Sequence, residues 1–353
     1  MNNNPRKEAH SAQVESPLVL GNCALRAGDY AAAITYYLRA QQAMPALSKI
    51  ISSNLTMARQ KYRATSQISE QLKEDFVDVL KTPYKWFVRP CIELTGKEVC
   101  IYTAYEPSGC LADYKRSYLN AIKKEGFFIV LVIVLDDIET DVSINGLEFV
   151  DGVLIRGNQG FDFSAWAAVM SLMPSIWSSK LLLLTNDSVF GPSNSFGKVI
   201  LNIRESDSDI VGLTESLEYD AHLQSYFLVF KTKALGSKLF RTYWEEIKNL
   251  RKKSDVIQSY EIKFTLFCKC IGLKCVALFP YEPDSIDYSR NIKNPLHYQW
   301  RSLVERGFPF VKVELLRDNP TQVDITNWKS FLKLYGFNEE LKCQIQRVIG
   351  RAE

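Results

Sequence analysis

The sequence predicts an α/β protein, in which a Rossmann-type, mostly parallel sheet is flanked by helices and follows a small all-α region. Three observations predict this class. From residue 98 onward, strand patterns alternate with helix patterns. Two unbroken apolar runs, 127–135 and 181–184, are typical of parallel strands that are buried on both faces. Residues 16–80 contain only helix patterns.

The chain is expected to be organised as a series of five segments. In order, they are a disordered tail at 1–15, a helical region at 16–80, a linker at 81–97, the α/β domain at 98–330 and a C-terminal helix at 331–353.

The helical region carries a spaced set of small and aromatic residues, Leu20-Gly21-(x6)-Gly28-Asp29-Tyr30-(x2)-Ala33-(x3)-Tyr37-(x2)-Ala40-(x4)-Pro45. This set resembles a tetratricopeptide repeat, and residues 47–64 add one more amphipathic helix. A single repeat cannot bury its own apolar face. The region is therefore either a helical cap on the α/β domain or a module that binds a protein partner, and both alternatives stay open.

The elements of the α/β domain follow from periodicity. The expected strands and helices, in chain order, are strand 99–103, helix 111–125, strand 127–135, strand 152–155, helix 163–173, strand 181–185, strand 209–213, helix 254–272 and strand 273–278.

Composition excludes several classes of protein. A net charge of +3 without a long basic run gives no reason to expect a nucleic-acid partner. Eight cysteines without a CxxC pair indicate reduced thiols rather than a zinc site. The polar N-terminus does not resemble a secretory signal, and no apolar run approaches the ~20 residues of a membrane span. A cytoplasmic protein is expected.

Four blocks of sequence resemble the rhamnan synthesis protein F family, over roughly residues 95–330 and in the family's order. The blocks are 156–166 (RGNQGFDFSAW), 185–192 (TNDSVFGP), 222–227 (HLQSYF), and 294–312, which contains Asn294-Pro295-(x)-His297-(x2)-Trp300 and Gly307-Phe308-Pro309-Phe310-Val311-Lys312. The resemblance implies a glycosyltransferase of the GT-A-like fold. It would transfer rhamnose or a related deoxyhexose from a dTDP-, UDP- or GDP-linked donor to a lipid-linked or polysaccharide acceptor, peripherally at the inner face of the cytoplasmic membrane.

Asp187 is the central candidate, because it follows the buried strand 181–185, and ligands of open α/β sheets bind beyond the carboxyl ends of the strands. Such a carboxylate suits Mg²⁺ or Mn²⁺ held against a diphosphate. The usual GT-A motif is Asp-x-Asp, however, whereas this chain reads Asn186-Asp187-Ser188. With one acid, the divalent cation would need His297 or His222 as a further ligand. The alternative role for Asp187 is an Asx turn at the strand end.

Other polar residues near strand ends are predicted to bind the nucleotide sugar. Asp136 follows a strand where this fold often contacts the base, although it could simply start a solvated loop. Arg156 could offset phosphate charge by bidentate contact. The full predicted set is Thr103, Ala104, Tyr105, Asp136, Arg156, Asn158, Gly160, Asp162, Asn186 and Ser188.

Glu261 is predicted to be the catalytic base that takes the proton from the acceptor hydroxyl, with Asp187 as the second catalytic residue. It lies within the helix pattern 254–272. The alternative is a surface glutamate paired with Lys263 or Lys253. The residues predicted to contact the sugar or acceptor are His222, Gln224, Ser225, Trp300 and Lys312. A rival interpretation is a noncatalytic carbohydrate-binding or scaffolding protein of polysaccharide assembly.

Overall fold

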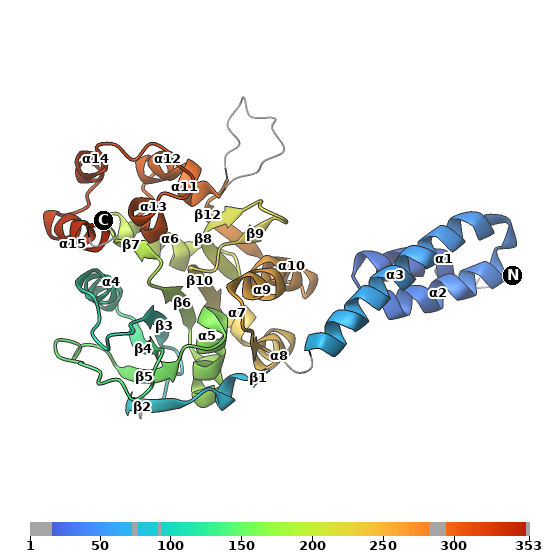
Figure 1. The fold of residues 1–353 in the computed structure, drawn as a ribbon, viewed down its shortest axis with the longest axis horizontal. Helices are drawn as coiled ribbons and strands as arrows, with labels where there is room; N and C mark the ends of the chain where they lie inside the picture. Colours follow the sequence, from blue (N-terminus) through green and yellow to red (C-terminus); the bar gives the residue numbers. More distant parts are fainter. Residues whose placement is uncertain (1–15, 73–76, 91–92, 282–293, 351–353) are drawn as a thin grey trace, which may run out of the picture. The chain divides into compact units, whose positions relative to one another are not determined.

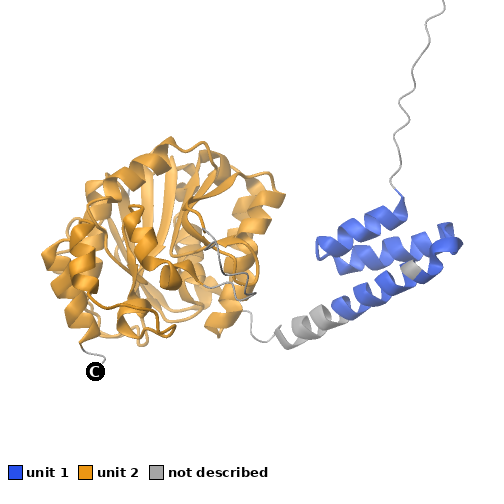
Figure 2. Cartoon of the chain, turned by 90° about the horizontal axis from the view of Figure 1, so that it is seen from above, with its two compact units in different colours: residues 1–76 blue, residues 77–353 orange. Residues whose placement is uncertain are grey.

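The computed structural model describes residues 16–72, 77–90, 93–281 and 294–350. The chain forms two compact units, residues 1–76 and 77–353 (Figure 2). The predicted tail at 1–15 lies outside the described residues.

The first unit packs three helices against one another, α1 (Pro17–Arg26), α2 (Tyr30–Ala43) and α3 (Ser48–Leu72). The ring of Tyr37 lies against Gly21, where a Cβ would come within 2.8 Å of the ring, so the small residue sets how closely α1 and α2 approach. Asp29 caps α2 by accepting a hydrogen bond from the Ala32 amide. The helices agree with the expected helical region, and its tetratricopeptide character stays a prediction.

The second unit is built on a mixed sheet, which has nine strands among the described residues (Figure 1). Its strand order is β12 (Cys275–Phe279), β8 (Ile210–Ser216), β10 (Phe227–Lys231), β6 (Leu181–Asn186), β3 (Glu98–Tyr105), β4 (Phe128–Leu135), β5 (Gly152–Gly157) and β2 (Tyr84–Val88), with β9 (His222–Leu223) beside β8. The pairs β12–β8, β6–β3, β3–β4 and β4–β5 are parallel, whereas β10 and β2 run antiparallel to their neighbours. The predicted fold class, α/β with a mostly parallel sheet, is confirmed.

Strand β2 corrects the predicted linker at 81–97. Tyr84–Val88 pairs antiparallel with β5 and forms one edge of the sheet. The two prolines of this segment made it look like a linker, but Pro83 and Pro90 lie just outside the strand, where they remove no ladder hydrogen bond.

Helices cover both faces of the sheet, because the buried strands carry apolar side chains on both sides. In β4, Val130 and Val132 pack on the face that is covered by α5 (Phe161–Leu172) and α8 (Lys238–Glu245). Ile129 and Leu131 pack on the opposite face, with α4 (Asp113–Lys124) and α6 (Phe196–Glu205).

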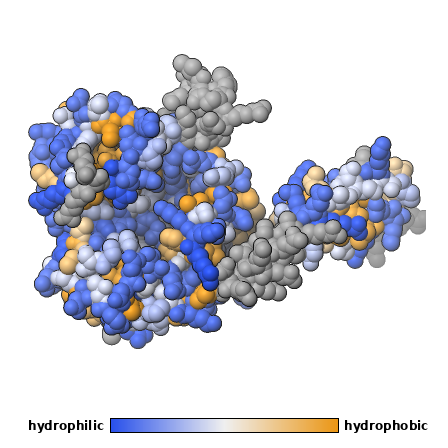
Figure 3. Space-filling model, viewed as in Figure 1, coloured by the Kyte–Doolittle hydropathy of each residue, from blue (hydrophilic) through white to orange (hydrophobic). Residues whose placement is uncertain are grey.

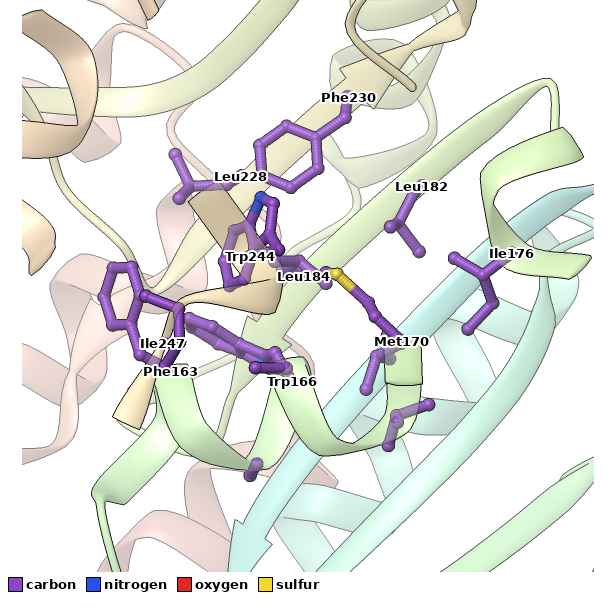
Figure 4. Close-up of a cluster of buried hydrophobic side chains, with 14 of the residues drawn as sticks. Phe163, Trp166, Met170, Ile176, Leu182, Leu184, Leu228, Phe230, Trp244 and Ile247 are labelled. Carbon is purple, nitrogen blue, oxygen red and sulfur yellow. The ribbon is translucent and has the colours of Figure 1, made fainter. Parts of the chain in front are cut away.

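The α5 face holds an aromatic cluster (Figure 4). Phe163 and Trp166 of α5 lie beside Trp244 of α8, and the Phe163 and Trp244 rings stack with their centroids 5.7 Å apart. Trp244 is therefore a core residue that anchors α5 and α8 to the sheet.

The remaining helices complete the second unit. They are α7 (Thr232–Leu235), α9 (Lys253–Val256), α10 (Ile262–Cys270), α11 (Pro295–Tyr298), α12 (Trp300–Glu305), α13 (Val313–Arg317), α14 (Trp328–Leu334) and α15 (Glu339–Ile349). The predicted C-terminal helix at 331–353 is thus two helices, separated at Gly336, whose φ of +80° ends α14.

Two short ladders join distant segments of this unit. β1 (Val77–Asp78) pairs with β11 (Lys248–Asn249), and β7 (Val189–Phe190) pairs with β13 (Val311–Lys312). The second ladder brings Lys312 next to the segment that follows β6.

The visible surface of this unit is mostly hydrophilic, with apolar residues in small separate groups (Figure 3). Within the described ranges, no helix combines the length and hydropathy that crossing a bilayer requires.

Candidate active site

A cavity of about 800 Å³ opens at the carboxyl ends of β3, β4, β5 and β6. Most of the predicted site residues line it, namely Thr103, Tyr105, Arg156, Asn158, Asp162, Asn186, Asp187, Ser188, His222, Gln224, Ser225, Glu261 and Lys312. The sheet topology therefore gathers residues from four separate sequence blocks at one place, as expected for an open α/β sheet.

Asp187 is held at the end of β6 by groups from β3 and α4. Its Oδ2 atom accepts a hydrogen bond from the Tyr105 amide at 3.1 Å and lies 2.5 Å from Nζ of Lys115. The backbone carbonyl of Asp187 accepts a hydrogen bond from the Tyr114 hydroxyl. The carboxylate thus ties the ends of two adjacent strands to α4.

Lys115 is a buried lysine, with 6% of its side chain exposed. Its ammonium lies 2.9 Å from Oε1 of Glu106 and donates to the Tyr105 carbonyl at 2.8 Å, in addition to its contact with Asp187. Burial acts against the charged form, but the nearby Asp187, Tyr114 and Glu106 together outweigh it, and the pKa of Lys115 is raised. The lysine is a permanent cation behind the cavity wall.

The Asx turn at the end of β6, which the sequence offered as an alternative role for Asp187, is formed by Asn186. Its Oδ1 atom accepts hydrogen bonds from the amide and the hydroxyl of Ser188. Its amide nitrogen donates to Asp162 at 2.7 Å. The Asx turn is therefore made by the amide, and Asp187 is left to bind Lys115.

Asp162 has the most perturbed carboxyl group of the cavity wall. Burial, and then the nearby Asp187 charge, raise the pKa of Asp162 to about 7. It is placed there by two successive left-handed residues, Gly160 (φ +76°) and Phe161 (φ +56°), at the start of α5. Gly160 does not line the cavity, but a Cβ there would lie 2.1 Å from the Ser164 hydroxyl, so only glycine fits.

A hydrogen-bonded cluster connects the ends of β3, β4 and β5. The Tyr105 hydroxyl donates to Asp136 at 2.6 Å, and the Asn158 amide donates to the same carboxylate at 2.9 Å. These two hydrogen bonds lower the pKa of Asp136. Asp136 is exposed and Ala104 is buried in β3, and neither lines the cavity. Asp136 therefore orients two lining residues.

Glu261 ends a π-helical turn, Ile257–Glu261, that joins α9 to α10. Its Oε1 atom accepts a hydrogen bond from the Ser225 amide at 2.8 Å. Such π turns are frequent at functional sites because they displace side chains from the regular helical positions. The alternative of a surface glutamate does not hold, because Glu261 is half-buried and lines the cavity.

His222 and Gln224 are oriented by the chain beside them. Nδ1 of His222 lies 2.7 Å from the Asp220 carbonyl, which only accepts, so Nδ1 carries the proton and Nε2 of the neutral ring is an acceptor. Gln224 accepts from Thr214 and donates to Asn294. Both side chains present fixed polar groups to the cavity.

Lys312 adds positive charge to the cavity wall. Burial lowers the pKa of Lys312, while Glu261 and Glu314 act in the opposite direction. Lys253 and Glu314 also line the cavity. The wall therefore combines two ammonium groups with several carboxylates.

The structure corrects two predicted contacts. The guanidinium of Arg156 is 1% exposed, and its terminal nitrogens donate to the Gln159 carbonyl, Thr82 and Asn249. These neutral acceptors use the donors that bidentate phosphate binding would need, and desolvation lowers the pKa of Arg156 to about 10.

Trp300 is buried among the C-terminal helices, where its indole N–H donates to the Asp324 carbonyl. It does not line the cavity, so it forms no sugar platform there.

The predicted pairing of Asp187 with His297 as metal ligands is not found. His297 is buried outside the cavity lining, with Nδ1 near the Thr321 hydroxyl and Nε2 3.7 Å from Glu314. Desolvation, followed by the charge of Lys312, lowers the pKa of His297. Over the described ranges, no three or more His, Cys, Asp or Glu side chains group in a way that could hold a metal ion. The residues present do not fit the divalent-cation shell that the sequence suggested.

The sequence analysis missed the most consequential contact, Lys115. A signal existed, because Lys115 lies three and four residues before Tyr118 and Leu119, on the apolar stripe of the predicted helix 111–125. A lysine in that position is buried, and a buried lysine needs an acidic partner. Glu218, Lys253 and Glu314 were also missed as lining residues, and no local pattern marks them.

Comparisons with known proteins identify relatives of this chain. The family model described as rhamnan synthesis protein F matches residues 131–338. Virulence protein VirA of Vibrio anguillarum is 28% identical over 256 residues, which are 64% of this chain and 81% of that protein. The uncharacterized protein y4gN of Sinorhizobium fredii is 30% identical over 212 residues, which are 57% of this chain and 54% of that protein.

Solved structures give weaker likenesses. A glycosyltransferase involved in the glycosylation of the major capsid of PBCV-1 has a TM-score of 0.32 at 8% identity, over 61% of this chain and 94% of that one. The glycosyltransferase GlyE of Streptococcus pneumoniae has a TM-score of 0.36 at 9% identity, over 72% and 65%. Scores this low assign neither fold nor function. The family match rests on sequence, and because it spans more than half of the residues, the chain belongs to the rhamnan synthesis protein F family.

Proposed function

We propose that this protein is a glycosyltransferase that moves a sugar from a nucleotide-sugar donor to a bacterial surface polysaccharide or its lipid-linked precursor. Membership of the rhamnan synthesis protein F family supports this activity. The observation that carries the proposal is the cavity at the strand ends, where Glu261 and Asp162 are each held in place by a neutral hydrogen-bond donor. Rhamnose or a related deoxyhexose, with dTDP, UDP or GDP as carrier, is the proposed donor because of the family's description.

The proposed reaction joins the acceptor to the donor sugar directly. The acceptor hydroxyl oxygen bonds to the anomeric carbon, the bond from that carbon to the diphosphate oxygen breaks, and the nucleoside diphosphate leaves with the electron pair. Glu261 takes the hydroxyl proton. The Ser225 amide fixes one of its carboxylate oxygens, so the proton goes to the other oxygen.

The remaining residues are assigned by their chemistry. Asp162, with a pKa of about 7, holds a proton part of the time at neutral pH, and its O–H then donates a hydrogen bond to a sugar hydroxyl. Lys312 and Lys253 balance the charge of the diphosphate. Tyr105 and Asn158, oriented by Asp136, contact the nucleotide.

The other proposed contacts concern the acceptor and the cell. His222, Gln224 and Ser225 bind acceptor or sugar hydroxyls, since a fixed polar site discriminates strongly against ligands that leave it unpaired. The protein acts in the cytoplasm at the inner face of the membrane, and the helices of the first unit recruit a protein partner.

The test is donor turnover with a matched pair of glutamate variants. Wild-type protein is mixed with dTDP-, UDP- and GDP-linked sugars, and release of the nucleoside diphosphate is followed. Glu261→Gln is expected to lower turnover by about 10²- to 10⁴-fold with donor affinity retained. The control is Glu246→Gln, an exposed glutamate next to the end of α8.

Two outcomes would contradict different parts of the proposal. If Glu261→Gln turns over like the control, the catalytic role of Glu261 is wrong. If calorimetry shows no binding of any nucleotide, the enzymatic proposal fails, and a noncatalytic carbohydrate-binding protein takes its place.

A further inference from the structure

We propose that Lys115 is the counter-ion of Asp187, and that the cavity binds its phosphate ligand without a divalent cation. The identity of that ligand rests on the proposed function, whereas the argument against a cation rests on the contacts of Asp187 and Lys115. Lys115 is a positioning residue in this proposal, since it acts through Asp187.

The first argument is the geometry of the ammonium group. A lysine ammonium has three N–H donors. Nζ of Lys115 has three acceptors within 3 Å, which are Asp187 at 2.5 Å, Glu106 at 2.9 Å and the Tyr105 carbonyl at 2.8 Å. Each donor therefore has an acceptor of the chain, and two of the three acceptors are carboxylates.

The second argument concerns the ability of the Asp187 carboxylate to bind a cation. Its Oδ2 atom already takes the Lys115 ammonium and the Tyr105 amide. A cation on the other oxygen would lie within a few ångströms of a buried positive charge. Two like charges at this separation repel each other, and the repulsion is stronger near a protein surface than in bulk water. Lys115 therefore opposes cation binding at this carboxylate.

The third argument is the number of ligands. Proteins hold Mg²⁺ through one or two carboxylates together with waters and substrate phosphates, but the candidate carboxylate here, Asp187, is already bound to the Lys115 ammonium. The neighbours of Asp187 on either side in the sequence are Asn186 and Ser188, whose oxygen atoms are hydrogen-bonded to each other. In the part of the chain that the structure describes, metal-ligating side chains do not gather in threes around any point that could hold a cation.

Without a cation, side chains of the protein balance the charge of a diphosphate. Lys312 and Lys253 line the cavity and come from β13 and α9. Ammonium groups are common phosphate ligands, and they supply point charges without a fixed coordination geometry. Lys115 itself donates to the chain, so it holds Asp187 in place and does not bind the ligand.

The decisive experiment titrates the full-length protein with Mn²⁺ alone and follows free Mn²⁺ by electron paramagnetic resonance. Wild-type protein is expected to have no saturable Mn²⁺ site that Asp187→Asn removes. Lys115→Met, which frees two carboxylates, is expected to gain such a site, and Lys115→Met/Asp187→Asn to lose it again. A purely structural role of Lys115 would not create a cation site. A stoichiometric wild-type site that Asp187→Asn abolishes would overturn the proposal.

A second measurement separates this inference from the proposed function. Calorimetry with UDP, dTDP and GDP is done once with EDTA and once with excess Mg²⁺. The dissociation constants are expected to agree within about twofold, and a gain of about tenfold or more with Mg²⁺ would overturn the proposal. If no nucleotide binds under either condition, the proposed function fails, while the Mn²⁺ titration still decides the cation question. If Lys115→Met does not fold, the comparison of wild type with Asp187→Asn decides it.

Discussion

Asp187 and Glu261 line the same cavity, yet the chain holds them in different ways. Asp187, at the end of β6, is bound by the buried ammonium of Lys115, whereas Glu261, just before α10, is bound by the amide of Ser225. An ammonium stabilises the charged form of a carboxylate more than a single peptide N–H does. Asp187 therefore suits a fixed charge that orders the strand ends, and Glu261 suits a proton acceptor. The Asn186-Asp187-Ser188 motif thus supplies the carboxylate that Lys115 binds.

The largest effect that tests this comparison is on stability. Lys115→Met leaves Asp187 and Glu106 without their shared cation, and breaking a buried pair costs about 3–5 kcal/mol. The free energy of unfolding is measured by urea titration with tryptophan fluorescence. All six tryptophans lie between residues 86 and 328, so the signal reports the second unit alone.

The control for this change is Lys124→Met, an exposed lysine at the end of the same helix. It is expected to change the free energy of unfolding by no more than about 0.5 kcal/mol. Equal losses in the two variants would show that the Lys115–Asp187 pair does not hold the strand ends together.

The next effect concerns ligand affinity. If Lys312 binds the diphosphate, Lys312→Met is expected to weaken nucleoside diphosphate binding by about 10- to 100-fold, the range for a charged hydrogen bond of about 1.5–3 kcal/mol. Calorimetry measures the dissociation constant, with Lys198→Met on the exposed side of α6 as the control. Unchanged affinity in Lys312→Met would place the diphosphate elsewhere.

An effect smaller than that of Lys115→Met is expected on the pH dependence of the free energy of unfolding, to which Asp162 contributes. Its pKa is raised from 3.8 to about 7 on folding, so the folded state binds more protons than the unfolded state between these values. Stability contributed by the protonated carboxyl is therefore present at low pH and is lost as the pH rises toward 7. Asp162→Asn is expected to remove this slope and to gain roughly 2–3 kcal/mol relative to wild type between pH 5 and pH 8. Parallel pH profiles for the two proteins would show that the carboxyl is not perturbed.

The smallest expected effect on affinity is at the hydrogen-bonded cluster of Tyr105, Asp136 and Asn158. Tyr105→Phe removes the hydroxyl that binds Asp136, and we expect nucleotide affinity to fall by about threefold because the loss is near 0.5–1 kcal/mol. The melting temperature should stay the same, since both side chains are exposed. Tyr84→Phe on the edge strand is the matched control, and equal affinities in the two variants would leave Tyr105 without a role in binding.

The sequence predicted the sheet and the position of the cavity because both follow from local patterns. Unbroken apolar runs mark β4 and β6, and polar residues directly after such strands lie at one edge of the sheet. That rule predicted Asp187, whereas His222 in β9 and Glu261 at the end of a π-helical turn were predicted on other grounds, and all three line the cavity.

The contacts that the sequence did not predict depend on partners that are distant in the chain. Arg156 looked like a phosphate ligand, but Thr82 and Asn249, 74 and 93 residues away, use its donors. Trp300 looked like a sugar platform, but α14 covers it through Phe331. Sequence periodicity and spacing do not show which side chains have contacts with residues far away in the chain. Those contacts are known only from the folded structure.

The most direct test is a crystal structure with a bound nucleotide sugar and an acceptor analogue. We predict that the diphosphate lies in the cavity near Lys312, and that the attacking hydroxyl oxygen is about 2.6–3.2 Å from a carboxylate oxygen of Glu261. A donor bound outside this cavity, or an acceptor hydroxyl that approaches Asp187 instead of Glu261, would contradict the account.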